Sequence, residues 1–386
     1  MPQPAAPSNV AVVHEWLVDR AGSEQVLEQI LALFPDATLY TLIDRMPQTD
    51  RAGLGQHRIV TSWLQRLPGV QRYFQRCLPL MPMAVQQFDL SGHDLVISSN
   101  HCVAKGVIVP PEALHLCYCH TPMRYAWDLQ AETLRAEGLE RGPLSWLARR
   151  MFFKLRLWDA STAHGVDHFV ANSRFVAQRI LKTYRREAAV IHPPVDLPHV
   201  SVTAGLRRPG HYVTVGRLMG YKNVALMLDA FRLLPDRQLT VIGTGPQEAA
   251  LRRAAPSNVH FAGRLPDAEM YEQVRTAQAF VFAAVEDFGI APVEALALGT
   301  PVIARGRGGV LDYLRHADNG WLYAASTPQT LAEAVRQSEA QWAGDVALRC
   351  QRSAQAFGAE RFREEFRDWV DSHWVAWVSG LQNSAA

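Results

Sequence analysis

The sequence of 386 residues has no apolar run near the ~20 residues that a membrane-spanning helix needs. Its first residues, MPQPAAPSN, lack the basic start and the apolar stretch of a signal peptide. Its five cysteines form no obvious disulfide framework, which is typical of a reducing compartment. These absences predict a cytoplasmic protein whose contact with a membrane is limited to its surface.

Metal-binding patterns are also scarce. Cys117, Cys119 and His120 lie close together, but no second Cys/His pair has the ligand spacing of a zinc site. The acidic residues show no magnesium-site spacing either. We therefore expect no metal and no cofactor, and we expect LHLCYCH (114–120) to form a buried strand with reduced cysteines.

Two stretches have no negatively charged residues, although positive and negative residues nearly balance over the whole chain, which has a net charge of +2. Residues 51–88 and 141–158 contain arginine, lysine and large apolar side chains but no Asp or Glu. A basic surface with Trp and Phe can lie against an anionic membrane. The alternative is a set of ordinary helices with solvated basic faces. We expect no nucleic-acid partner.

Strand-like and helix-like segments alternate along the chain, which predicts an α/β fold with parallel sheets. The alternation is interrupted between Pro193 and Gly210, where we place a linker. The sequence therefore predicts two Rossmann-like domains, 1–197 and 198–358, that face each other across a cleft. Residues 359–386 read as an amphipathic helical segment that packs back on the first domain.

Two glutamates separated by seven residues, Glu286 and Glu294, are the most informative feature of the second domain. They occur in VEDFGIAPVEALALGTPVIA, where a strand, an acidic loop and a helix follow one another. In open α/β sheets, ligands bind beyond the carboxyl ends of the strands. Both carboxylates are thus expected at that edge, where they can accept hydrogen bonds from a polyol such as a sugar or a ribose.

Two cations follow the first strand of the same domain, in VGRLMGYKN. Arg217 can grip phosphate oxygens in a fork, and Lys222 adds a point charge near a helix N-terminus. This arrangement predicts a diphosphate site, whereas a solvated loop is the alternative.

Two glycine-rich loops are less specific. Gly243-Thr244-Gly245 resembles part of a dinucleotide fingerprint but lacks the third glycine, so a tight strand-to-helix turn is the plainer interpretation. The loop 305–309, RGRGG, could bind an anion through its backbone N–H groups, or it could be a flexible surface loop.

In the first domain, Gly22 lies in a small-residue turn that opens a helix and leaves room for another molecule. His120 ends a strand and is followed four residues later by Arg124. Asn172 ends another strand, where it could also cap the next helix. We predict His120, Arg124 and Asn172 as contacts for an acceptor.

Together these segments resemble retaining glycosyltransferases of family four, which have the GT-B fold of two Rossmann-like domains. The glutamate motif and VGRLMGYKN carry the resemblance in the second domain. In the first domain, VVHEWLVDRAGSEQVLE, YCHTPMRYAWD and VANSRFVAQRI resemble the WbaZ-type mannosyltransferases of O-antigen and exopolysaccharide assembly. Where the family usually has two adjacent glycines, this chain has Ala21-Gly22.

The resemblance implies roles for individual residues. Arg217 and Lys222 would hold the donor diphosphate, Glu294 the ribose, and Glu286 the transferred sugar. His120 would lie near that sugar on the acceptor side and belong with Glu286, Arg217 and Lys222 to the catalytic set. The other donor contacts would be Gly22, Gly263, Arg264, Leu265, Phe288, Gly289 and Ile290.

The resemblance also implies a metal-independent enzyme that transfers a sugar with retention, with GDP-mannose as donor and a polyprenyl-diphosphate-linked saccharide as acceptor. Such a protein would lie at the inner face of the cytoplasmic membrane, in lipopolysaccharide or other polysaccharide biosynthesis. A transferase that uses a UDP- or ADP-sugar is one alternative. A sugar-nucleotide epimerase and a non-catalytic sugar-nucleotide binder are others, and a nicotinamide oxidoreductase is the weakest.

Overall fold

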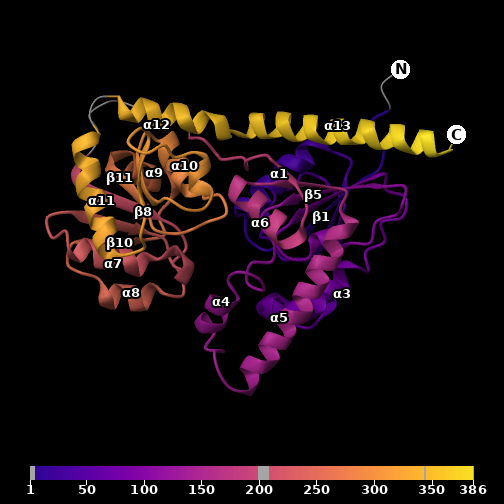
Figure 1. The fold of residues 1–386 in the computed structure, drawn as a ribbon, viewed down its shortest axis with the longest axis horizontal. Coiled ribbons are helices and arrows are strands. Elements are labelled where there is room, and N and C mark those ends of the chain that lie inside the picture. The colour runs from indigo at the N-terminus through magenta and orange to yellow at the C-terminus, as the bar shows by residue number, and fades with distance from the viewer. Residues whose placement is uncertain (1–4, 199–207, 343–344, 386) are drawn as a thin grey trace. The chain divides into compact units, whose positions relative to one another are not determined.

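The computed structural model describes residues 5–198, 208–342 and 345–385, and its strands form two parallel sheets (Figure 1). The chain divides into two compact units: Met1–Pro194 with Ala359–Ala386, and Val195–Gly358. Half of the predicted linker, residues 199–207, lies outside the described residues. The division falls at Pro194 and not at residue 197, because Val195 packs in the core of the second unit and its N–H bonds the Phe357 carbonyl at 2.8 Å.

The sheet of the first unit has seven parallel strands in the order β3-β2-β1-β4-β5-β6-β7. The long apolar runs of its central strands are typical of parallel strands that are buried on both faces. The strands are β1 (Val10–Leu17), β2 (Thr38–Asp44), β3 (Ile59–Thr61), β4 (Leu95–Asn100), β5 (Leu114–Cys119), β6 (His168–Ala171) and β7 (Ala188–Val190).

Helices cover both faces of this sheet. On one face, α1 (Gly22–Leu33) and α13 (Ala359–Ala385) bury side chains against β1, β4 and β5. On the other face lie α3 (Met81–Val85), α5 (Pro143–Thr162) and the 3-10 helix η4 (Phe74–Leu80). The remaining helices of the unit are α2 (Val70–Tyr73), α4 (Gln130–Ala136) and α6 (Arg174–Tyr184).

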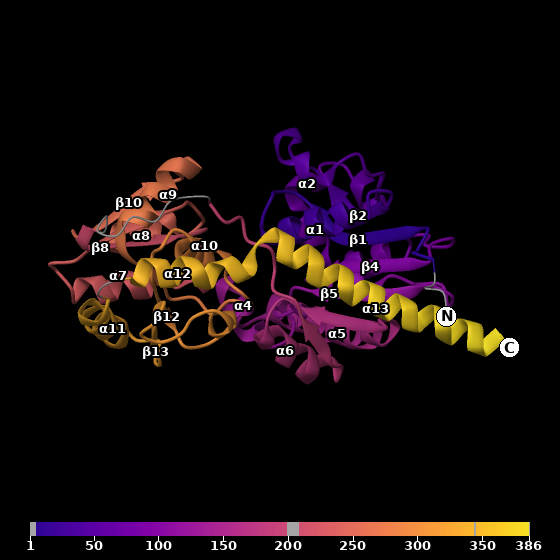
Figure 2. The same ribbon diagram turned by 90° about the horizontal axis from the view of Figure 1, so that it is seen from above.

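The sheet of the second unit has six parallel strands in the order β10-β9-β8-β11-β12-β13. The strands are β8 (Arg208–Val215), β9 (Gln238–Ile242), β10 (Val259–Gly263), β11 (Ala277–Phe282), β12 (Val302–Arg305) and β13 (Gly320–Tyr323). Its helices are α7 (Val224–Arg232), α8 (Glu248–Ala254), α9 (Asp267–Thr276), α10 (Ile290–Ala297), α11 (Pro328–Gln341) and α12 (Val346–Ala354). Helices α7, α8 and α11 pack on one face, and α9, α10 and α12 pack on the other, with α12 in front of the strands in the view of Figure 2.

The predicted α/β class with parallel sheets is confirmed, and so is the buried strand at residues 114–119. The alternating pattern missed β3, which has only three residues and occurs inside the acid-free stretch 51–88. It also missed α12, a nine-residue helix. Within the described residues, no helix combines the length and the apolarity needed to cross a bilayer.

The last helix, α13, supplies Phe362, Phe366 and Val370 to the core of the first unit, where each is at most 1% exposed. The rings of Phe362 and Phe366 stack and meet Tyr118 of β5 edge-on. The first unit therefore includes side chains from both ends of the described sequence.

Phe366→Ala should lower the free energy of unfolding by about 3–5 kcal/mol, because it removes a fully buried ring from this core. Urea denaturation followed by circular dichroism measures the change. Val375→Ala is the matched control, since Val375 lies on the same helix but is 40% exposed, and it should cost less than about 0.5 kcal/mol. Equal effects of the two substitutions would contradict the packing of α13.

Candidate functional site

Each sheet has one point where the strand order reverses. In the first unit this point lies between β1 and β4, and in the second it lies between β8 and β11. At such a point the two crossover connections leave in opposite directions, and a crevice opens beyond the carboxyl ends of the two strands. The predicted site residues cluster at these two places, Arg217, Lys222 and Glu286 in the second unit, and Gly22 and His120 in the first.

In the second unit, an ion pair connects the two strands that flank the reversal point. Lys222 ends the 3-10 helix η7 (Gly220–Lys222) after β8, and its Nζ contacts Oε1 of Glu286 in the loop after β11. Both side chains are about four-fifths buried, with exposures of 18% and 17%. The neighbouring Asn223 donates from Nδ2 to the Ala283 carbonyl at 3.4 Å. The structure thus brings together two residues that are 64 positions apart.

The loop that carries Glu286 is held by a second loop of the same unit. Gly309 donates its N–H to the Glu286 carbonyl at 2.9 Å, and Tyr313 donates its hydroxyl to the carbonyls of Phe288 and Gly289 at 3.1 and 3.0 Å. A Cβ at Gly309 would lie 2.3 Å from the Asp287 carbonyl oxygen. The RGRGG loop therefore has a packing role, because any larger residue at Gly309 would displace the acidic loop.

Close packing also requires glycine at positions 243 and 245. A Cβ at Gly243 would lie 2.1 Å from the Gly216 oxygen, and one at Gly245 would lie 2.6 Å from the Leu218 backbone. The Leu218 N–H bonds the Thr244 carbonyl at 2.9 Å. These glycines let the loop that follows β9 support the loop that carries Arg217, as the tight-turn interpretation predicts.

Glu294 lies on α10, one turn after the helix begins, and is mostly buried. Burial raises the pKa of its carboxyl group to about 7, with further contributions from the negative charges of Asp196 and Asp267. A buried carboxylate near other acids is costly when ionised. Hydroxyl groups of a ligand would lower that cost by donating hydrogen bonds to it.

The other predicted donor residues of the second unit differ in exposure. Arg217 and Arg264 are exposed, whereas Phe288 is 3% exposed with its ring packed on Tyr313. Gly289 precedes α10 with φ of 90°, a conformation that favours glycine, and Ile290 begins the helix. Gly263 ends β10, and Leu265 packs on the core, so the backbone of 263–265 passes along the edge of the sheet.

In the first unit, the buried carboxylate of Glu15 organises the reversal point. Its Oε1 accepts N–H groups of His101, Cys102 and Ala104 at 2.9, 2.8 and 3.2 Å. Its Oε2 lies 3.0 Å from Nδ1 of His101. Burial alone would raise the pKa of Glu15, but the charge and hydrogen bonds of His101 hold it well below its usual range. Burial opposes protonation of His101, yet Glu15 raises the pKa of that ring.

A second set of contacts leads from α1 to His120. Glu24 Oε1 lies 3.3 Å from Nε2 of His14, whose Nδ1 lies 3.1 Å from the Ser99 hydroxyl. That hydroxyl lies 2.9 Å from Nε2 of His120. Burial, together with the neighbouring His101 and His14, lowers the pKa of His120 to about 3. His120 is therefore a neutral ring near pH 7.

The turn at Gly22 is also held by Glu24, whose Oε2 accepts the Ala21 N–H and the Ser23 hydroxyl, both at 3.0 Å. Burial alone would raise the pKa of Glu24, but its interaction with His14 lowers that pKa to about 2. An ionised carboxylate in the first turn of α1 is favoured by the helix dipole.

The two remaining predicted acceptor residues also end strands or lie near them. Arg124 is close enough to His101 for its charge to oppose protonation of that ring, which lowers the pKa that Glu15 raises. Asn172 is 6% exposed, and its Oδ1 has no hydrogen-bond partner among the described residues. The helix after it is capped by Ser173, which accepts the Val176 N–H at 3.1 Å, so Asn172 is not the cap.

Sequence reasoning missed His14, Glu15, Glu24 and His101 as members of the first-unit cluster. A signal was present, because His14 and Glu15 occur consecutively in an otherwise apolar strand. His101 directly follows β4, the strand that neighbours β1. Their contact depends on the strand order, which the pattern of apolar residues does not give.

One comparison with known protein families concerns the second unit. Residues 208–356 match the family model described as Glycosyl transferases group 1. The second unit is therefore similar to group 1 glycosyl transferases over nearly all of its described length. The chain is 29% identical over 191 residues to the D-rhamnosyltransferase WbpZ of Pseudomonas aeruginosa, a match that covers 45% of this chain and 50% of that protein. It is 26% identical over 254 residues to the alpha-1,3/1,6-mannosyltransferase alg2 of Schizosaccharomyces pombe, covering 54% and 47%.

The matched segments therefore span about half the length of these curated relatives. Among solved structures, Anabaena Alr3699/HepE in complex with UDP aligns with 94% of this chain and 100% of its own, at a TM-score of 0.68 and 16% identity. That likeness shows the fold, and it confirms the predicted GT-B class. The narrower resemblance to WbaZ-type proteins stays a prediction.

Glu294→Gln should raise the melting temperature at pH 8 and have little effect at pH 4.5. Because the pKa of Glu294 is about 7 in the folded chain and about 4.5 ordinarily, the folded state binds more protons between these values. Stability is therefore lost as the pH rises through that window, and Gln removes the loss. Differential scanning calorimetry at both pH values measures it.

Glu269→Gln is the matched control, since Glu269 is an exposed carboxylate on α9. It should change the melting temperature little at either pH. A Glu294→Gln variant that is no more stable at pH 8 than the parent would contradict the raised pKa.

Proposed function

We propose that this protein is a retaining glycosyltransferase that moves mannose from GDP-mannose to a polyprenyl-diphosphate-linked saccharide in surface polysaccharide synthesis. The observation that carries the proposal is the Lys222–Glu286 pair. It places a cation and a carboxylate together at the strand reversal point of a unit that is similar to group 1 glycosyl transferases. A nucleotide sugar has a diphosphate for the first group and hydroxyls for the second.

Lys222 and Arg217 would bind the donor diphosphate. Cleavage of the sugar–phosphate bond builds negative charge on the leaving phosphate, and cations fixed in place stabilise that charge where it develops. Lys222 is fixed by Glu286, whereas exposed Arg217 can reach outward to a ligand. The two side chains supply this charge without a metal ion.

Glu294 would accept the ribose hydroxyls. Because burial raises its pKa to about 7, its carboxyl group is partly protonated near neutral pH, and hydrogen bonds from two hydroxyls favour the ionised form. Donor binding would thus release a proton from this residue.

Glu286 would hold hydroxyls of the transferred sugar. Retention by double displacement needs a carboxylate free to attack the anomeric carbon. Glu286 is engaged by Lys222. We therefore favour attack of the acceptor on the face that the phosphate leaves, with that phosphate taking the acceptor's proton.

The acceptor would lie near His120, Arg124 and Asn172 of the first unit. His120, whose lowered pKa keeps it neutral, can donate or accept a hydrogen bond with a sugar hydroxyl. The Oδ1 of Asn172 offers a further acceptor atom. We place the protein at the inner face of the cytoplasmic membrane, where a lipid-linked acceptor is available.

The assignment of mannose is supported by the names of the relatives. One is called a D-rhamnosyltransferase and another a mannosyltransferase, and D-rhamnose is the 6-deoxy form of D-mannose. The solved structure of Anabaena Alr3699/HepE is a complex with UDP, which supports a UDP-sugar as the second candidate.

Thermal-shift screening tests the donor. GDP-mannose should raise the melting temperature more than UDP-glucose or ADP-glucose, with a stabilisation of about 2.7 kcal/mol at about a hundred times its Kd. UDP-glucose stabilising the protein at least as strongly would reject GDP-mannose. No response to any nucleotide sugar would reject the transferase.

Separate roles for the two glutamates are expected in steady-state kinetics. Glu286→Ala should lower kcat about 10- to 100-fold, because it releases both the sugar and Lys222. Glu294→Ala should weaken donor binding by about 10- to 100-fold while kcat changes less, since it removes charged hydrogen bonds to the ribose. Glu269→Ala, on the exposed side of α9, is the control, and the opposite split would mean that the roles are exchanged.

A further inference from the structure

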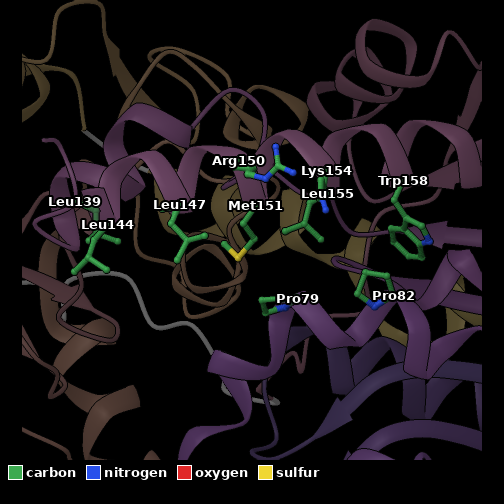
Figure 3. Close-up of a pocket in the computed structure, with 11 residues that line it drawn as sticks. Pro79, Pro82, Leu139, Leu144, Leu147, Arg150, Met151, Lys154, Leu155 and Trp158 are labelled. Carbon is green, nitrogen blue, oxygen red and sulfur yellow. The ribbon is translucent and has the colours of Figure 1, made fainter. Parts of the chain in front are cut away.

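An apolar groove in the first unit lies between α5 and the segment formed by η4 and α3 (Figure 3). Leu147, Met151 and Leu155 point from α5 toward Pro79 and Pro82. The volume is about 660 Å³, which lies within the range of small-molecule sites. The groove contains none of the residues that we assign to donor or acceptor chemistry.

Several large apolar side chains of α5 are exposed to solvent, both at the groove and elsewhere on the helix. Leu144 and Leu147 line the groove and are 65% and 56% exposed. On the same helix, Trp146, Phe153 and Leu157 are also exposed. Single exposed apolar residues are common, but several grouped on one element mark a binding surface.

Two cations border this groove, one helical turn apart. Arg150 and Lys154 both line it, and no described carboxylate forms an ion pair with either. The one acid of α5, Asp159, is fully buried and pairs with Lys105 at 2.8 Å. The lining residues include no Asp or Glu. The groove thus offers an apolar floor and a positive border, which complement a molecule with a hydrocarbon chain and an anionic head.

Helix α5 is held firmly enough to keep this shape. Asp159 also accepts the Trp127 indole N–H at 2.8 Å and the Tyr184 hydroxyl at 3.0 Å. The ring of Trp158, at one end of the groove, lies so close to Gly106 that a Cβ there would be 2.3 Å from it. The groove is therefore part of the folded unit.

We propose that this groove binds the hydrocarbon chain of a polyprenyl diphosphate, with Arg150 and Lys154 contacting its phosphates. The inference rests on the proposed function, because it names the site that would hold the lipid of the acceptor. A polyprenyl diphosphate has one chain and one anionic head, which matches one groove beside two cations. Burial of a hydrocarbon chain favours binding, but a single chain alone binds only weakly, so both parts of the site are needed.

Binding of farnesyl diphosphate to the full chain, measured by isothermal titration calorimetry, tests the proposal. It should bind at least about tenfold more tightly than inorganic pyrophosphate, because only the former carries a chain. Leu147→Gln and Lys154→Gln should each weaken its binding about fivefold to tenfold. Of these two variants, only Lys154→Gln should also weaken the binding of pyrophosphate.

Matched controls come from the same helix. Leu157→Gln changes an apolar residue that is 59% exposed and does not line the groove, and Arg149→Gln changes a cation that bonds Ser145. Neither should alter the affinity. Equal effects of Leu147→Gln and Leu157→Gln on the affinity would overturn the proposal that the groove binds the chain.

Two further measurements separate this site from the donor site. Lys222→Met should leave the chain-dependent part of farnesyl diphosphate binding intact, and its loss in that variant would overturn the proposal. GDP-mannose should stabilise Leu147→Gln as it does the parent, so a failed groove leaves the proposed transferase standing. Groove variants that lose only binding to phosphatidylglycerol vesicles would assign the surface to a phospholipid and overturn the proposal.

Discussion

The ion pair between Lys222 and Glu286 is the contact around which the second unit is arranged. It is mostly buried and crosses the reversal point of the sheet, so each partner is the counter-ion of the other. Removing one partner of a buried pair leaves an uncompensated charge, which is far more costly than the pair itself contributes. The surrounding loops serve this contact: the glycines of one support the lysine side, and the RGRGG loop supports the glutamate side.

The first unit uses a carboxylate at the corresponding place in a different way. Glu15 is fully enclosed: three backbone N–H groups bond its Oε1 and the His101 ring lies 3.0 Å from its Oε2, so it fixes the loop after β4. Glu286 is partly open, and its carboxylate pairs with the side chain of Lys222. A carboxylate that is saturated by its own chain gives shape, whereas one with remaining acceptor capacity can still receive a ligand.

Much of the second unit was predictable from sequence. The run from Ala277 to Ala297 has an apolar strand, a glycine turn and a helix in the order that the structure shows. The positions of Arg217 and Glu286 after their strands followed from the same pattern. The Lys222–Glu286 contact did not, because it depends on which strands are neighbours and the chain between them contains two other strands.

The first unit was less predictable for the same reason. His14, Glu15 and His101 meet because β4 returns beside β1, after β2 and β3 have been placed on its other side. The raised pKa of Glu294 was likewise invisible, since it arises from burial and from Asp196, nearly a hundred residues away. The groove beside α5 was foreseen only as a basic aromatic stretch, because its opposite wall comes from Pro79 and Pro82.

The place of α13 in the first unit has a consequence for the order in which the chain folds during synthesis. Domains of a growing chain usually fold in sequence order. Here the unit that begins first still lacks Phe362, Phe366 and Val370 when all of Val195–Gly358 has been made. The second unit is continuous in sequence and can fold on the ribosome. Until α13 has been synthesised, part of one face of β1, β4 and β5 is uncovered. Such a delay exposes apolar strands to aggregation and to chaperones, so the rate at which the last helix is delivered would govern the yield of folded protein.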